Sequence, residues 1–92
     1  MGSFQSILRQ PARGEWYRVV RSFVDADGDE HPPGEKWQYL FSWFSKFEDE
    51  VTLCVRSISG EEWKIPLSWG EEGQARVIEH CQEYFAPVGP AV

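Results

Sequence analysis

Strict alternation of aromatic and polar side chains runs from Glu35 to Phe44. Four large aromatic residues occupy one phase of it: Trp37, Tyr39, Phe41 and Trp43. Because a period of two sends successive side chains to opposite faces of a strand, this segment is predicted as a β-strand with these four in one row. The other phase is also partly apolar, so the strand belongs either to the middle of a curled sheet or to a binding surface.

Three further segments have the alternation and the β-branched or aromatic content of strands. They are 16–23, 51–58 and 61–67. Arg21 interrupts the first pattern and marks where that strand leaves the sheet. Ser59-Gly60 predicts a tight hairpin between the last two strands. Pro66 has no N–H, which places its strand at a sheet edge or ends its pairing there.

The last predicted element is a helix from about Gly70 to Phe85. Apolar residues recur there at three and four positions, the stripe of an amphipathic helix: Ala75, Ile78, Cys81 and Phe85. Ser68 can cap its start and Pro87 would end it. We expect Ile78 and Phe85 to be buried against the sheet.

At 92 residues the chain has room for one core, so residues 1–92 are predicted to form a single domain. The ordered core would span about 3–86, with a short helical turn over Ser3–Gln10 and a mobile tail over 88–92. The predicted fold class is α+β, mainly β. It is a small bent antiparallel sheet or an SH3-like barrel of four to five strands, with a C-terminal amphipathic helix.

A spaced motif resembles a family of small bacterial domains of unknown function over roughly residues 8 to 85. The residues that carry it are Tyr17-Arg18-Val19-Val20, Phe23-Val24-Asp25, Asp27-Gly28, His31, Gly34-Glu35-Lys36-Trp37 and Phe47-Glu48-Asp49. That pattern would have a glycine near Phe41 and another near Glu50, and neither is present. The resemblance implies no activity.

The net charge of −6 disfavours nucleic acid and anionic membranes as partners, because both are bound mainly by clustered Lys and Arg. The basic residues here are spread singly. The sequence contains neither a signal-peptide pattern nor a long apolar run, so we expect a cytoplasmic protein. We expect its two cysteines, Cys54 and Cys81, to be reduced and buried.

The acidic stretch from Asp25 to Gly34 offers oxygen ligands for calcium at Asp25, Asp27, Asp29 and Glu30. The spacing differs from an EF-hand loop, since counting from Asp25 puts glycine fourth and Lys36 twelfth. We therefore predict a solvated Asp-Gly turn that is the most mobile internal segment and needs no metal. The cysteines and the two histidines, His31 and His80, lack the spacing of a zinc site. We expect no metal and no cofactor.

Catalysis has weak support in the sequence. Neighbouring carboxylates within 48–50 and 61–62 would point to opposite sides of a strand or turn and seldom form an acid/base pair. A Cys54–His31 couple would need a reactive thiol, whereas a mid-strand cysteine is buried and inert. The enzyme hypothesis is therefore disfavoured, though it stays open.

The leading hypothesis is a non-catalytic protein-interaction module with an aromatic and acidic surface. Its motivation is the surplus of aromatic residues on the strand over Glu35–Phe44, since not every Trp can fit in so small a core. The alternative is that Trp43 and Trp69 simply cap the ends of the core. The predicted surface consists of Phe41, Trp43, Trp69, Glu48 and Asp49, and its carboxylates would prefer a basic protein partner. The alternatives are a small enzyme or ligand-binding domain with a pocket between sheet and helix, and a subunit that buries the aromatic patch in a homodimer.

Overall fold

The computed structural model describes residues 11–88, so the expectations for Ser3–Gln10 and for most of the 88–92 tail lie outside the described residues. Seven strands and one α-helix follow in chain order. They are β1 (Trp16–Val19), β2 (Phe23–Val24), β3 (Glu30–His31), β4 (Lys36–Ser45), β5 (Glu50–Arg56), β6 (Glu62–Ser68), α1 (Glu72–Glu79) and β7 (Phe85–Pro87), with a 3₁₀ turn at Cys81–Glu83 before β7.

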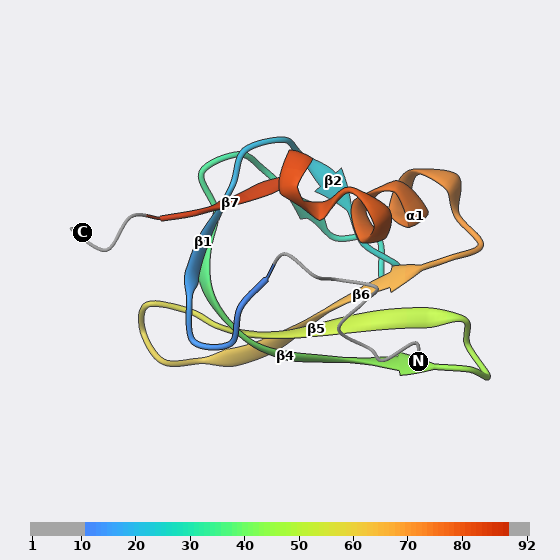
Figure 1. Ribbon diagram of the computed structural model, residues 1–92, viewed down its shortest axis with the longest axis horizontal. Coiled ribbons are helices and arrows are strands. Elements are labelled where there is room, and N and C mark those ends of the chain that lie inside the picture. Colours follow the sequence, from blue (N-terminus) through green and yellow to red (C-terminus); the bar gives the residue numbers. More distant parts are fainter. Residues whose placement is uncertain (1–10, 89–92) are drawn as a thin grey trace.

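Five of the strands form one antiparallel sheet in the order β6-β5-β4-β1-β7, and β2 pairs with β3 in a separate small sheet. The five-stranded sheet bends sharply. In Figure 1, β4, β5 and β6 form one layer, and β1 rises from it to pair with β7 in a second layer that also contains α1. The bent antiparallel sheet is confirmed. The alternative of an SH3-like barrel is wrong, because the sheet stays open and its two edge strands, β6 and β7, do not pair.

The core lies between the two layers and is mainly aromatic and β-branched. Trp37, Tyr17 and Phe85 are its largest fully buried side chains. The ring of Phe85 meets both of the others edge-on. Each such contact contributes roughly 0.5 to 1.5 kcal/mol of stability beyond the contribution of the buried area. This helps to stabilise a chain of this size.

A β-bulge at Leu40 overturns the prediction of one continuous aromatic row in β4. Tyr39 pairs with Val55 and Phe41 with Cys54, so one extra residue stands between the two pairs. Because side chains alternate strictly, an extra residue reverses the face of everything after it. Trp37 and Tyr39, before the bulge, face the core, whereas Phe41 and Trp43, after it, face outward.

The two corners where the resembling family pattern would have glycine are both irregular. The bulge lies beside Phe41, and Asp49, next to Glu50, has a φ of 55°. A left-handed conformation costs most residues roughly 1 to 2 kcal/mol, and aspartate tolerates it better because its short carboxylate bonds locally. The chain thus makes both corners without glycine.

The predicted helix is shorter than expected. α1 ends at Glu79, and its start at Glu71 has no side-chain cap, since Ser68 is the last residue of β6. Ile78 and Phe85 are both fully buried, as expected, but Phe85 belongs to β7. There it pairs with Val19 of β1, so Pro87 stands in an edge strand and does not end the helix.

The acidic stretch is also more structured than predicted. β2, which lies just before it, pairs with β3 inside it, and both Asp25 and His31 are buried. Gly28 makes the turn between the strands with a φ of 87°, a conformation that glycine adopts without strain. The prediction of a wholly solvated loop is therefore wrong for these two side chains.

Candidate functional site

The bulge places Phe41 and Trp43 side by side on the outer face of the sheet. Their ring centroids are 5.9 Å apart and the ring planes are tilted by 31°. The two residues remain 43% and 37% exposed, although both lie within a sheet strand. This pair, called the outer aromatic pair below, exposes apolar area to solvent.

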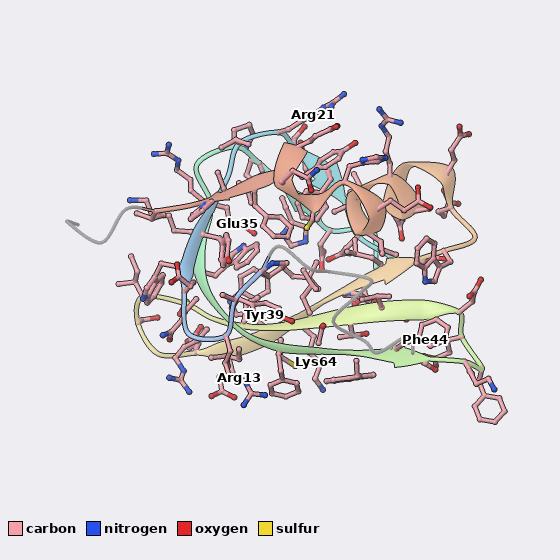
Figure 2. All side chains as sticks on the ribbon, viewed as in Figure 1. Arg13, Arg21, Glu35, Tyr39, Phe44 and Lys64 are labelled. Carbon is pink, nitrogen blue, oxygen red and sulfur yellow. The ribbon has the colours of Figure 1, made fainter. Side chains whose placement is uncertain are left out.

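The next strands extend this surface. Register places Thr52 and Cys54 of β5 beside the pair, followed by Pro66 and Lys64 of β6. The ammonium group of Lys64 lies 5.6 Å from the centroid of the Trp43 ring, which is within range of a cation–π contact. Figure 2 shows Lys64 and Arg13 on the side of the sheet away from the helix.

Cys54 is buried on this outer face of the sheet, beside Phe41. Burial raises the pKa of its thiol, and the nearby Lys64 charge opposes that shift only in part. Because the thiolate is the reactive form, this raised pKa argues against nucleophilic chemistry. Cys54 and Cys81 form no disulfide.

The turn after β4 carries the predicted acidic rim. Glu48 and Asp49 are exposed, and Phe47 beside them is fully exposed. Burial, with the charges of Glu48 and Asp27, raises the pKa of the Glu50 carboxyl. An excess of negative charge therefore gathers at this end of the sheet, next to the outer aromatic pair.

Trp69 does not join that pair. It is half-buried and packs against the core cluster. Its backbone N–H donates to the carbonyl of Asp49 at 2.9 Å, which holds the chain after β6 against the acidic turn. Of the predicted surface residues, the structure thus brings together Phe41 and Trp43, with Glu48 and Asp49 in the adjoining turn.

Sequence reasoning missed a buried polar cluster around His31. Its Nδ1 lies 2.7 Å from Glu35 Oε2, and its Nε2 lies 2.8 Å from Asp25 Oδ2. The ring stacks between Phe23 and Trp63, with centroids at 4.8 and 5.8 Å. The one visible sign in the sequence was a histidine with carboxylates six residues before it and four after it.

Carboxylates on both ring nitrogens require the imidazolium form, in which each nitrogen donates a proton. Burial alone would lower the pKa of His31, but the hydrogen bonds and charges of Glu35 and Asp25 outweigh it and raise the pKa. Glu35 also accepts from the Trp37 indole N–H at 3.0 Å. The cluster ties the β2–β3 hairpin to the start of β4.

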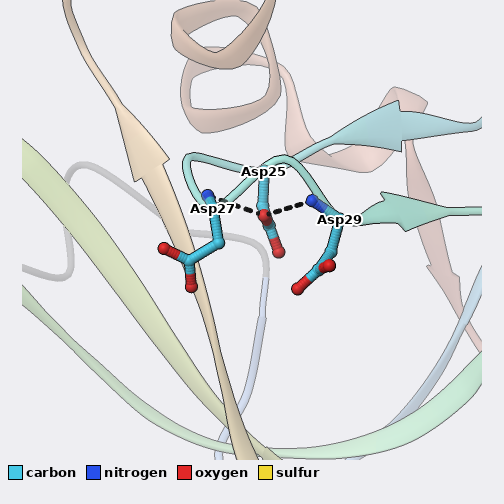
Figure 3. A group of neighbouring side chains, drawn as sticks. All are labelled: Asp25, Asp27 and Asp29. Atoms are coloured by element: carbon cyan, nitrogen blue, oxygen red, sulfur yellow. Dashed lines mark hydrogen bonds between the residues drawn. The ribbon is translucent and has the colours of Figure 1, made fainter.

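The Asp25 carboxylate is fully engaged. Its Oδ1 accepts the backbone N–H groups of Asp27 and Asp29 at 2.9 and 3.0 Å (Figure 3). Ligand oxygens of these three residues lie within 4.8 Å of one another. With Oδ2 held by His31 and Oδ1 by the turn, Asp25 acts as the turn's internal acceptor, the role that an Asp-Gly turn favours.

A hollow of about 610 Å³ lies between β2 and α1. Its wall includes Phe23, Asp25, Gln74 and Tyr84. Gln74 donates from its side chain to the Asp25 carbonyl at 3.2 Å and accepts the Ser68 N–H. His31, the histidine with the raised pKa, does not line this hollow. The polar groups of Asp25 and Gln74 in the wall serve the fold, which weakens the alternative of a pocket enzyme.

The comparisons with known proteins show a likeness among solved structures. No protein-family model matches the chain, and no curated protein is similar to it. Among solved structures it is similar to an integron cassette protein from the mobile metagenome of Vibrio cholerae. The two are 29% identical with a TM-score of 0.79, over 85% of this chain and 88% of the other. That likeness supports the α+β fold and names no activity.

Among residues 11–88, no helix has the length and apolar character needed to cross a membrane.

Proposed function

We propose that this domain is a non-catalytic protein-interaction module whose binding surface is the outer aromatic pair with the adjoining acidic turn. The observation that carries the proposal is the exposure of Phe41 and Trp43 at 43% and 37% on a face that no described element covers. Aromatic side chains bury large areas at little conformational cost, so they dominate the energy of protein interfaces.

The rim of this surface indicates the chemistry of the partner. Glu48 and Asp49 are exposed beside the aromatic pair, and the chain as a whole carries −6. Complementary charge raises association rates and excludes wrong partners. A partner with an apolar centre and basic side chains near it fits this surface best.

We also propose that the domain works in the cytoplasm. Its two cysteines are buried and form no disulfide, a state that reducing compartments preserve.

Photo-crosslinking in the native cell tests the binding surface. A photoreactive phenylalanine analogue replaces Phe47, which is fully exposed in the acidic turn beside the aromatic pair. We expect a discrete crosslinked product, and we expect Trp43→Ser to remove it. The matched control places the same analogue at Ile58, which is 76% exposed in the turn between β5 and β6.

The crosslinked products from positions 47 and 58 show whether the proposed surface binds a partner. A product from position 47 that is absent at 58 and is lost with Trp43→Ser supports the interaction surface. No product at 47, or the same products from both positions, would refute it.

A further inference from the structure

Strand β4 has an open edge over its second half. On one side β5 pairs with it from Gln38 to Ser45. On the other side β1 pairs only with Lys36–Gln38, and the turn before β1 adds two backbone hydrogen bonds to Tyr39. Beyond that point, no residue of 11–88 pairs with the far edge of Phe41–Ser45. In Figure 1 this part of β4 forms the lower border of the ribbon.

This edge lacks the protection of the other two. Edge strand β6 carries Pro66 and edge strand β7 carries Pro87. Proline, glycine and charged residues discourage further strand pairing. The segment Phe41–Ser45 contains none of them, and three of its five residues are aromatic. Such an edge is a template for another strand.

We propose that a second copy of this chain pairs antiparallel with Phe41–Ser45, about a twofold axis at Trp43. Two five-stranded sheets then become one continuous sheet. Trp43 lies opposite its counterpart, and Phe41 lies opposite Ser45 of the partner copy. This inference rests on the proposed function and names the partner of that surface.

The charges at the two ends of the edge favour a second copy. Arg13 closes one end, where its Nε donates to the Leu40 carbonyl at 3.1 Å. The turn at 46–50 closes the other end and contains one lysine and three carboxylates. Antiparallel pairing brings the Arg13 end of each copy to the acidic end of the other. The interface thus complements itself, as a twofold contact must.

Sedimentation equilibrium of the full chain over a range of concentrations tests the pairing. We expect a reversible dimer, and we expect Trp43→Lys to yield a folded monomer because it places a charge on the edge. Ile58→Lys, in the turn between β5 and β6, adds the same charge elsewhere and should leave the dimer intact. A monomeric wild-type chain, or equal loss in both variants, would overturn the proposal.

Exchanging the charges at the two ends of the edge tests whether a second copy of the chain pairs with it. Arg13→Glu alone should weaken the dimer about tenfold, since each exposed ion pair contributes roughly 0.2 to 1 kcal/mol and occurs twice. Adding Glu48→Arg should restore it. If the double variant is as weak as the single one, the copies do not pair in this direction.

Amide hydrogen exchange distinguishes a failure of the dimer proposal from a failure of the proposed function. Amides of 41–45 that are protected in a monomer would mean that the chain's own residues 1–10 or another segment covers the edge, which would overturn the dimer. A crosslink from position 47 to a different protein would do the same, yet the interaction surface itself would stand.

Discussion

Replacing His31 with alanine should be among the most costly single changes in the domain. Its side chain is 5% exposed and contacts carboxylates of Asp25 and Glu35 through both ring nitrogens. A hydrogen bond to a charged group contributes roughly 1.5 to 3 kcal/mol, and breaking a buried charge pair costs roughly 3 to 5 kcal/mol. Glu35 is 21% exposed and can regain water, whereas Asp25 cannot. We therefore expect a loss of about 3 to 4 kcal/mol.

Urea denaturation followed by tryptophan fluorescence measures this loss. The matched control is His80→Ala, because the side chain of His80 is 44% exposed and lies 4.0 Å from Glu83. An exposed pair of that kind should change the unfolding free energy by no more than about 0.5 kcal/mol. A loss below about 1 kcal/mol for His31→Ala, or equal effects of both changes, would refute the reasoning.

The same contacts set a pH dependence with a definite sign. The pKa of His31 is raised above its ordinary value of 6.5 in the folded chain. Its contribution to stability is then complete below pH of about 6.5 and is lost as pH rises through the raised folded pKa. The difference in unfolding free energy between the wild type and His31→Ala should decrease as pH rises through this range. A difference that increases with pH would contradict the charged form of His31 in the folded chain.

Three smaller predictions follow from other parts of the structure. Cys54 and Cys81 should react slowly with Ellman's reagent in the folded chain and yield two thiols on unfolding, so a fast-reacting Cys54 would revive the nucleophile hypothesis. Calcium should raise the melting temperature no more than an equal concentration of magnesium, because Asp25 is already engaged; a clear excess for calcium would contradict this. Asp49→Gly should stabilise the chain by about 0.5 kcal/mol in urea denaturation by relieving the positive φ, and a loss of that size would argue against the strained turn.

Local patterns in the sequence were enough to predict the strands of the first layer. The alternation within 51–58 and 61–67 matches β5 and β6, and Pro66 lies in an edge strand, one of its two expected outcomes. The hairpin between them is at the expected place, but it spans 57–61 and is longer than a two-residue turn. These elements pair with their neighbours in the chain, so their pattern and their contacts agree.

The missed features depend on contacts that are distant in sequence. Phe85 fits the helical stripe, but pairing with Val19 draws it into β7. The bulge at Leu40 leaves no mark in an alternating pattern, and it decides which face Phe41 and Trp43 occupy. His31 lay in a segment rich in turn residues, where only the fold brings its carboxylate partners to both ring nitrogens.

The most direct test of the account pairs two readouts on Trp43→Ser. At a concentration where the chain is monomeric, the unfolding free energy should fall by only about 1 to 2 kcal/mol, since the residue lies on the outer face. Crosslinking from position 47 should disappear in the same variant. If the variant loses about 3 to 5 kcal/mol or fails to fold, as a core tryptophan would, while crosslinking from the wild-type surface is absent, the binding surface is misplaced.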